Sequence, residues 1–131
     1  MSIATAAFKP VGSGKTFSMF GLDESAIFTG GASSRGTVPR VCEEVLTAMK
    51  DRQQSFDIES EVGVSYVEVY GDQVSDLLKF GARCGQSKVA SQRFVLQGAA
   101  ERPIQSMEDV AEVLRTGAQQ KRRAATAMNG K

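Results

Sequence analysis

The chain has 131 residues, of which 41% are hydrophobic and 24% are charged, so it is long enough for one domain with a core and is not typical of a disordered chain. Its formal net charge is +1, which gives no global attraction to a polyanion such as nucleic acid. Histidine is absent from the sequence, which excludes Ser-His-Asp and Cys-His catalysis and every histidine-ligated metal site.

Cys42 and Cys84 are the two cysteines, and they form no C-x-x-C pair, so we expect neither a disulfide framework nor a zinc knuckle. We therefore expect the protein to reside in a reducing compartment and not in an oxidising one. The first eight residues lack the basic start of a signal peptide, and no apolar run approaches the length of a membrane span. The sequence therefore predicts a partner that is neither nucleic acid nor membrane.

The most informative motif is Gly12-Ser13-Gly14-Lys15-Thr16, the second half of a phosphate-binding loop with the pattern G-x-x-x-x-G-K-[ST]. In such a loop, backbone N–H groups surround the phosphates, the lysine reaches the β- and γ-phosphates and the threonine hydroxyl binds Mg²⁺. The helix that follows adds its positive N-terminal end. The motif predicts a nucleotide site.

The first half of the loop departs from the pattern. Where the pattern has glycine the chain has Lys9, and Pro10, which follows it, has no N–H to offer a phosphate. Val11 is β-branched and stiff. The stretch 3–8, where a buried strand normally precedes the loop, is rich in alanine, so either that strand is degraded or the true start lies upstream. Descent from a nucleotide-binding protein and present nucleotide binding are therefore separate predictions.

Downstream of the loop we expect a short helix from Lys15 to about Phe20, ending near Gly21, and then a long loop over 22–36. Thr37, as N-cap, and Pro39, in the first turn, predict the start of a second helix that runs to about Lys50. Its apolar face is more typical of a core than of a binding groove and consists of Val38, Val41, Cys42, Val45, Leu46 and Met49.

Glu43 and Glu44 fall on the solvated side of that helix, and we assign them no catalytic role. A polar turn is expected over 51–55. The strongest strand signal is Val64–Tyr70, within 56–70, and Glu68 on it is interpreted as a carboxylate at an edge or rim.

Gly71-Asp72 breaks that strand, and 74–78 is expected to form a short helix or turn. The stretch 79–97 is expected to be irregular until a short strand at 93–96. Ser106 begins a capping-box helix that Gly117 is expected to end, and 119–128 is compatible with further helix.

Alternating helices and strands around a phosphate loop predict the α/β class, with a P-loop NTPase arrangement in which helices flank a mostly central parallel or mixed sheet. Because only two or three strands are visible, we expect that sheet to be incomplete.

Four stretches together resemble the kinesin motor domain in order and spacing: Gly12–Gly21, Gly36–Val45, Val64–Leu78 and Arg123–Asn129. They correspond to its phosphate loop, its second helix, its "SYVEIYNE…DLL" unit and the lead-in to its switch I. The resemblance extends over nearly the whole chain from Gly12 on. It implies that residues 1–131 are a partial motor domain in which the N-terminal strands, switch II and the microtubule-binding helices are missing.

The resemblance implies a site for ATP and Mg²⁺. The phosphates would be held by Gly12, Ser13, Gly14, Lys15 and Thr16, with Thr16 also on Mg²⁺. Phe17 would flank the adenine. The loop 22–36 would correspond to the variable loop at which family members accept allosteric ligands. No complete catalytic set is present, so the isolated chain is expected to hydrolyse little or no ATP.

The resemblance also implies contacts with microtubules. The stretch 79–93 resembles the small lobe that touches β-tubulin, which makes Arg83, Lys88 and Arg93 candidates for tubulin's acidic surface. The alternative for these three residues is an ordinary solvated loop. By the same resemblance, residues 121–123 would lie on or after the third helix of the family, near the nucleotide. The alternative for them is a set of charges that complement the end of a helix dipole.

Two functions stay open at this point. The chain is either the ATP-binding piece of a cytoplasmic motor that moves along microtubules of the cytoskeleton, or a non-catalytic kinesin-like remnant that binds tubulin or another motor chain. Any homodimer would form through regions outside these residues. A different NTPase or kinase is disfavoured, because no Asp-x-x-Gly motif follows. Because its sheet is incomplete, we expect the isolated chain to be marginally stable or prone to aggregation.

Overall fold

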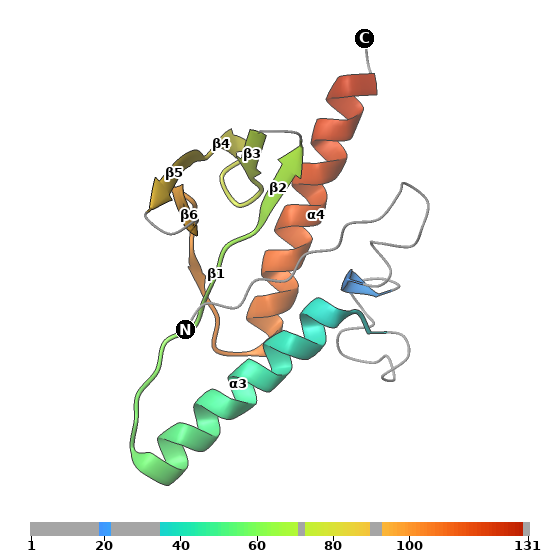
Figure 1. Cartoon of the computed structure of the whole chain (residues 1–131). Coiled ribbons are helices and arrows are strands. Elements are labelled where there is room, and N and C mark those ends of the chain that lie inside the picture. The colour runs from blue at the N-terminus through green and yellow to red at the C-terminus, as the bar shows by residue number, and fades with distance from the viewer. Residues whose placement is uncertain (1–18, 22–34, 71–72, 90–92, 130–131) are drawn as a thin grey trace. The chain divides into compact units, whose positions relative to one another are not determined.

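The computed structural model describes residues 19–21, 35–70, 73–89 and 93–129 (Figure 1). The chain divides into two compact units. The first consists of Met1–Val62 with Gln105–Ala111, and the second consists of Gly63–Ile104 with Glu112–Lys131. Each unit is described by itself.

In the first unit, helix α3 spans Thr37–Phe56. It starts where predicted, with Pro39 buried in its first turn, a position at which the missing N–H of proline costs nothing. The expectation that Thr37 is the N-cap is wrong. The cap is Gly36, which is extended (φ −72°, ψ 174°) and has no side chain to accept a hydrogen bond.

Helix α3 continues past the end predicted near Lys50, so the turn expected over 51–55 is wrong. The polar residues of that stretch are tolerated in a helix and contain neither glycine nor proline. The helix ends at Asp57, which takes up the left-handed conformation (φ 53°) while its N–H donates to the Gln53 carbonyl over 3.1 Å.

The strands of the second unit are β1 (Gly63–Val64), β2 (Val67–Tyr70), β3 (Gln73–Asp76), β4 (Ala82–Arg83), β5 (Gly85–Val89), β6 (Arg93–Gln97) and β7 (Arg102–Pro103). They form three small sheets with the orders β1-β7, β2-β3-β4 and β5-β6. Every pairing between these described strands is antiparallel. The expected central parallel or mixed sheet is therefore not seen in the described part of the chain.

The single strand predicted at Val64–Tyr70 is divided into two, because its ends pair with different partners. Val64 pairs with Arg102 in β7, whereas Val67 pairs with Asp76 in β3. The helix or turn expected at 74–78 is a strand as far as Asp76, and the turn begins only at Leu77. Pairing with β2 decides this outcome, and the side chains of β3 alternate in burial as a strand requires.

The irregular stretch expected over 79–97 contains an ordered hairpin. Strands β5 and β6 pair from Gly85 with Gln97 to Val89 with Arg93. The short strand predicted at 93–96 is confirmed as β6, one residue longer. The partner strand β5 was not predicted, because Gly85-Gln86-Ser87-Lys88 has weak strand propensity. The extended conformation of β5 therefore depends on its pairing with β6.

Helix α4 spans Met107–Asn129 and crosses from the first unit into the second. Its predicted capping pattern is confirmed: the Ser106 hydroxyl accepts from the Asp109 N–H over 3.3 Å, and Asp109 Oδ2 accepts from the Gln105 N–H over 2.8 Å. The expected stop at Gly117 is wrong. Gly117 is buried inside the helix, and a Cβ there would overlap the ring of Tyr66. This glycine permits a close approach and does not end the helix.

The buried side chains divide between the two units. In the first unit they include Leu46, Val110 and Ala111. In the second they include Val74, Leu77, Leu78, Ile104 and Val113, together with one carboxylate, Asp76. None of the helices in the described residues is both long enough and apolar enough to cross a membrane.

Candidate nucleotide site

The predicted ATP and Mg²⁺ ligands, Gly12 to Thr16, and the predicted adenine contact, Phe17, lie outside the described residues, so these assignments stay predictions. The described part of the chain begins at Met19, two residues after Phe17. Met19 and Phe20 are helical, and Gly21 is not. The described end of the predicted first helix therefore falls where the sequence placed it.

Two glycines hold this helix end beside the start of α3. Gly21 forms an antiparallel bridge with Arg35 and has a positive φ of 91°, which glycine adopts without steric cost. Gly36 is buried so close to the main chain of Met19 and Phe20 that any Cβ would overlap their backbone atoms. The residues that follow the phosphate-loop motif are thus packed against the N-terminus of α3 within the first unit.

Arginine side chains reinforce the same junction. Arg35 forms an ion pair of 2.9 Å with Glu43 of α3, and Arg40 Nε donates to the Gly36 carbonyl over 3.3 Å. Glu43 is half exposed, as predicted for the solvated side of the helix, and its role is to pair with Arg35. A surface pair of this kind stabilises the fold by about 0 to 1 kcal/mol.

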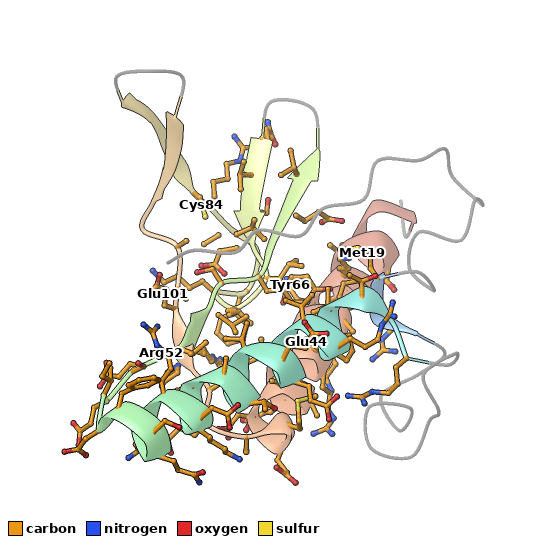
Figure 2. The ribbon with its side chains drawn as sticks, turned by 60° about the horizontal axis from the view of Figure 1, so that its bottom comes forward. Met19, Glu44, Arg52, Tyr66, Cys84 and Glu101 are labelled. Carbon is orange, nitrogen blue, oxygen red and sulfur yellow. The ribbon has the colours of Figure 1, made fainter. Side chains whose placement is uncertain are left out.

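Neither Cys42 nor Tyr66 has the character of a nucleophile, and Tyr66 is labelled in Figure 2. Burial raises the pKa of the Cys42 thiol, which keeps it protonated at neutral pH. Burial, with a smaller contribution from the charge of Glu68, raises the pKa of Tyr66 to about 12. Lys121 Nζ lies 5.4 Å from the centre of the Tyr66 ring, a cation–π distance.

The three candidates for microtubule contact lie on three different strands. Arg83 is exposed in β4, opposite Ser75 of β3. Lys88 lies in β5, opposite Phe94, and Arg93 lies in β6, opposite Val89. The structure therefore brings the backbones of Lys88 and Arg93 together on one hairpin and places Arg83 in a different sheet. Contact of these residues with tubulin stays a prediction.

Sequence reasoning missed one buried carboxylate. Asp76 is 1% exposed, and it accepts the Leu78 N–H over 2.8 Å and the Ala100 N–H over 2.6 Å. It thereby joins the turn after β3 to the chain that follows β6. The sequence signal for Asp76 was its position at the start of the Asp-Leu-Leu sequence in the kinesin-like unit. Elsewhere in the described residues, no group of three or more acidic or cysteine side chains could hold a metal ion.

Comparison with solved structures defines the class of fold. The chain superposes on the solved structure of a fast kinesin with a TM-score of 0.75 and 30% sequence identity, over 91% of this chain and 32% of that chain. The chain therefore has the fold of part of a kinesin motor.

Comparison with a protein-family model gives the family. The model of the kinesin motor domain matches residues 2–131, so the chain belongs to the kinesin motor domain family. Kinesin-like protein K39 of Leishmania chagasi is 32% identical over 94% of this chain and 14% of its own length. Kinesin-related protein 3 of Dictyostelium discoideum is 35% identical over 90% of this chain and 10% of its own length. The chain thus spans a small part of the curated relatives that it matches.

Proposed function

We propose that this chain is the nucleotide-binding part of a microtubule motor and that it binds Mg·ATP through Gly12–Thr16. The observation that carries the proposal is the match of the kinesin motor domain to residues 2–131, a range that contains the Gly-Ser-Gly-Lys-Thr motif. The packing of Gly36 against Met19 supports it, because Met19 follows the last residue of the motif by three positions and is held against the start of α3.

The proposed roles follow from the chemistry of the motif. The Lys15 ammonium neutralises charge on the β- and γ-phosphates, the Thr16 hydroxyl binds Mg²⁺, and Phe17 flanks the adenine. Hydrolysis also needs a positioned water and charge stabilisation around the γ-phosphate. We assign hydrolysis, and movement along microtubules in the cytoplasm, to a motor of the relatives' full length and not to these residues alone.

A calorimetric titration with Mg·ATP tests this proposal. We expect saturable binding by the chain and no detectable binding by Lys15→Ala, because the substitution removes the charge that faces the phosphates. Lys50→Ala is the matched control, since Lys50 is an exposed lysine of α3 outside the motif, and it should bind as the unmodified chain does. Heat that is unchanged by Lys15→Ala, or absent up to millimolar ATP, contradicts the proposal.

A second function is favoured by Lys9 and Pro10, which replace the glycine and an N–H donor in the first half of the loop. In this alternative the chain is a non-catalytic module that binds tubulin or another motor chain through basic residues such as Arg83, Lys88 and Arg93. It predicts pelleting with microtubules that weakens with salt, ignores nucleotide and decreases in Arg83→Gln. Pelleting at the level of an inert protein in low salt excludes this alternative.

A further inference from the structure

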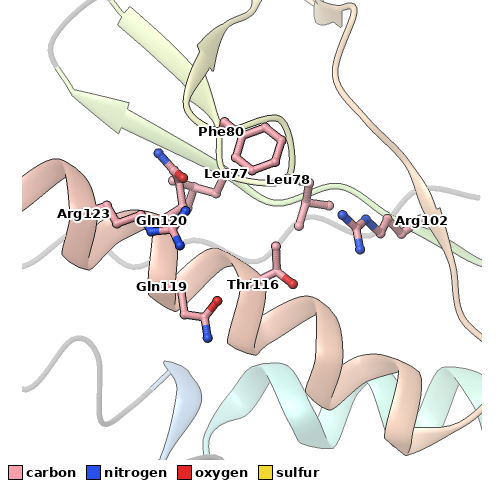
Figure 3. Close-up of a pocket in the computed structure, with 8 residues that line it drawn as sticks. All are labelled: Leu77, Leu78, Phe80, Arg102, Thr116, Gln119, Gln120 and Arg123. Atoms are coloured by element: carbon pink, nitrogen blue, oxygen red, sulfur yellow. The ribbon is translucent and has the colours of Figure 1, made fainter.

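A small pocket lies in the second unit, between the turn after β3 and one side of α4 (Figure 3). Its volume is about 70 Å³. Three lining residues come from the turn, one from β7 and four from α4: Leu77, Leu78, Phe80, Arg102, Thr116, Gln119, Gln120 and Arg123.

Two arginines approach the pocket from different elements. Arg102 from β7 and Arg123 from α4 lie on opposite sides of the leucines of the turn (Figure 3). Neither guanidinium has an ion-pair or hydrogen-bond partner among the described residues. Thr116 contributes no free hydroxyl proton, because its hydroxyl already donates to the Glu112 carbonyl over 2.9 Å. The two guanidiniums are therefore the charged donors of the lining, beside the side-chain amides of Gln119 and Gln120.

The rim of the pocket carries an aromatic residue in an unfavourable position. Phe80 has a φ of 55° and Gly81 a φ of 78°, and the Ala82 N–H donates to the Lys79 carbonyl over 3.1 Å. A two-residue turn with positive φ at both positions favours Asn-Gly, and a bulky residue at its first position is strained. The Phe80 ring is also 84% exposed, so burial does not offset that strain. The fold of the free chain gains nothing from phenylalanine here.

We propose that this pocket binds the carboxylate of an acidic peptide segment from a partner protein, with a neighbouring apolar side chain of that segment resting on Phe80. Guanidinium groups match carboxylates in geometry as well as charge, which makes an acidic side chain the complementary ligand for Arg102 and Arg123. The pocket volume of about 70 Å³ leaves room for a carboxylate group. An exposed aromatic beside unpaired arginines is typical of interface anchors.

Titration with a blocked hexapeptide that carries one glutamate beside one leucine tests the charge part of the proposal. We expect saturable binding to the full chain that weakens about tenfold when the glutamate is replaced by glutamine, and about tenfold in Arg123→Gln. Arg122→Gln is the matched control, because Arg122 is the exposed neighbour on α4 that does not line the pocket, and it should leave the affinity unchanged. Equal weakening by both arginine substitutions overturns the proposal.

Phe80→Asn separates a binding role from a structural one. Asparagine suits the turn, so this variant should unfold at a higher temperature than the unmodified chain and yet bind the peptide several-fold more weakly. Unchanged affinity in Phe80→Asn overturns the proposal. Displacement of the peptide by equimolar inorganic phosphate also overturns it, since that result defines a general anion site. The proposal is also overturned if the chain self-associates and the peptide abolishes this self-association, because the pocket is then occupied by a second copy of the chain.

This inference does not rest on the proposed function. Peptide binding that survives Lys15→Ala while Mg·ATP binding is lost confirms both proposals, and either can fail without the other.

Discussion

The two long helices of the described structure differ in how completely their apolar faces are covered. Along α3 only Pro39 and Leu46 are buried, and the rest of the face that the sequence predicted as core is only partly buried. Along α4 four residues are buried within a short stretch: Val110, Ala111, Val113 and Gly117. An amphipathic pattern therefore predicts which face of a helix is apolar, and it does not predict how completely that face is covered.

The contacts of α4 explain its closer packing within the second unit. Gly117 has no side chain, so the ring of Tyr66 can lie against the backbone of the helix. Lys121, one turn further on, lies over the same ring. Asp76 holds the turn that contacts this part of α4 by accepting two backbone N–H groups. Four predictions test this comparison between the helices, and they are ordered by decreasing size of the expected effect.

Asp76→Asn should destabilise the chain most, by about 3 kcal/mol in urea unfolding. The carboxylate accepts two N–H groups in a buried site, and an amide can accept only one of them while directing its own N–H₂ at the other. Asp51→Asn on the exposed end of α3 is the control and should change the free energy of unfolding by less than about 0.5 kcal/mol. Equal effects of the two substitutions would contradict the role given to Asp76.

The same substitution in each helix compares the two faces directly. Val113→Ala in α4 should cost about 2 kcal/mol, because Val113 is 3% exposed and its methyl groups leave a cavity. Val45→Ala in α3 should cost less than about 1 kcal/mol, because Val45 is only partly buried. Urea unfolding of both variants measures the difference, and a larger cost for Val45→Ala would reverse the comparison.

Gly117→Ala should destabilise the chain by about 1 kcal/mol, although alanine is the better helix former. The overlap with Tyr66 costs about 1 to 3 kcal/mol, which exceeds the gain in helix propensity of about 1 kcal/mol. In a Tyr66→Ala background the overlap is gone, so the same substitution should be neutral or stabilising. A double-mutant cycle by thermal unfolding tests this change of sign.

The smallest expected effect is a loss of stability in alkali. Because the pKa of Tyr66 rises from its ordinary value of 10 to about 12 in the fold, the folded state favours the neutral phenol. This contribution is complete below pH 10 and is lost as the pH rises towards 12. After a discount for solvent screening it amounts to about 1 kcal/mol. Urea unfolding of Tyr66→Phe at several alkaline pH values should lack this decline, and an identical decline would assign it to other groups.

Local signals predicted the parts of the fold whose causes lie within a few residues. Pro39 marked the start of α3, Ser106 and Asp109 marked the start of α4, and the β-branched run Val67–Tyr70 formed a strand. In each case the residues that determine the element are neighbours in the sequence. The kinesin resemblance, based on four ordered stretches, was confirmed by the family match.

The errors arose where distant residues decide the outcome. Gly117 was predicted to end a helix because nothing near it in the sequence shows that Tyr66 packs against it. The strand at Gln73–Asp76 depends on its pairing with β2, and the burial of Asp76 depends on Ala100. The pocket was equally invisible, since Phe80, Arg102 and Arg123 come from three separate elements. The nucleotide ligands Gly12–Thr16 were predicted from the motif and lie outside the described residues.

Hydrogen exchange in the presence and absence of Mg·ATP tests nucleotide binding by this chain, because it reports both binding and its location. We predict slower amide exchange across Gly12–Phe20 at saturating Mg·ATP, loss of that protection in Lys15→Ala, and no change in the middle of α4. Exchange across Gly12–Phe20 that is the same with and without millimolar Mg·ATP would contradict the assignment of this chain as a nucleotide-binding part of a motor.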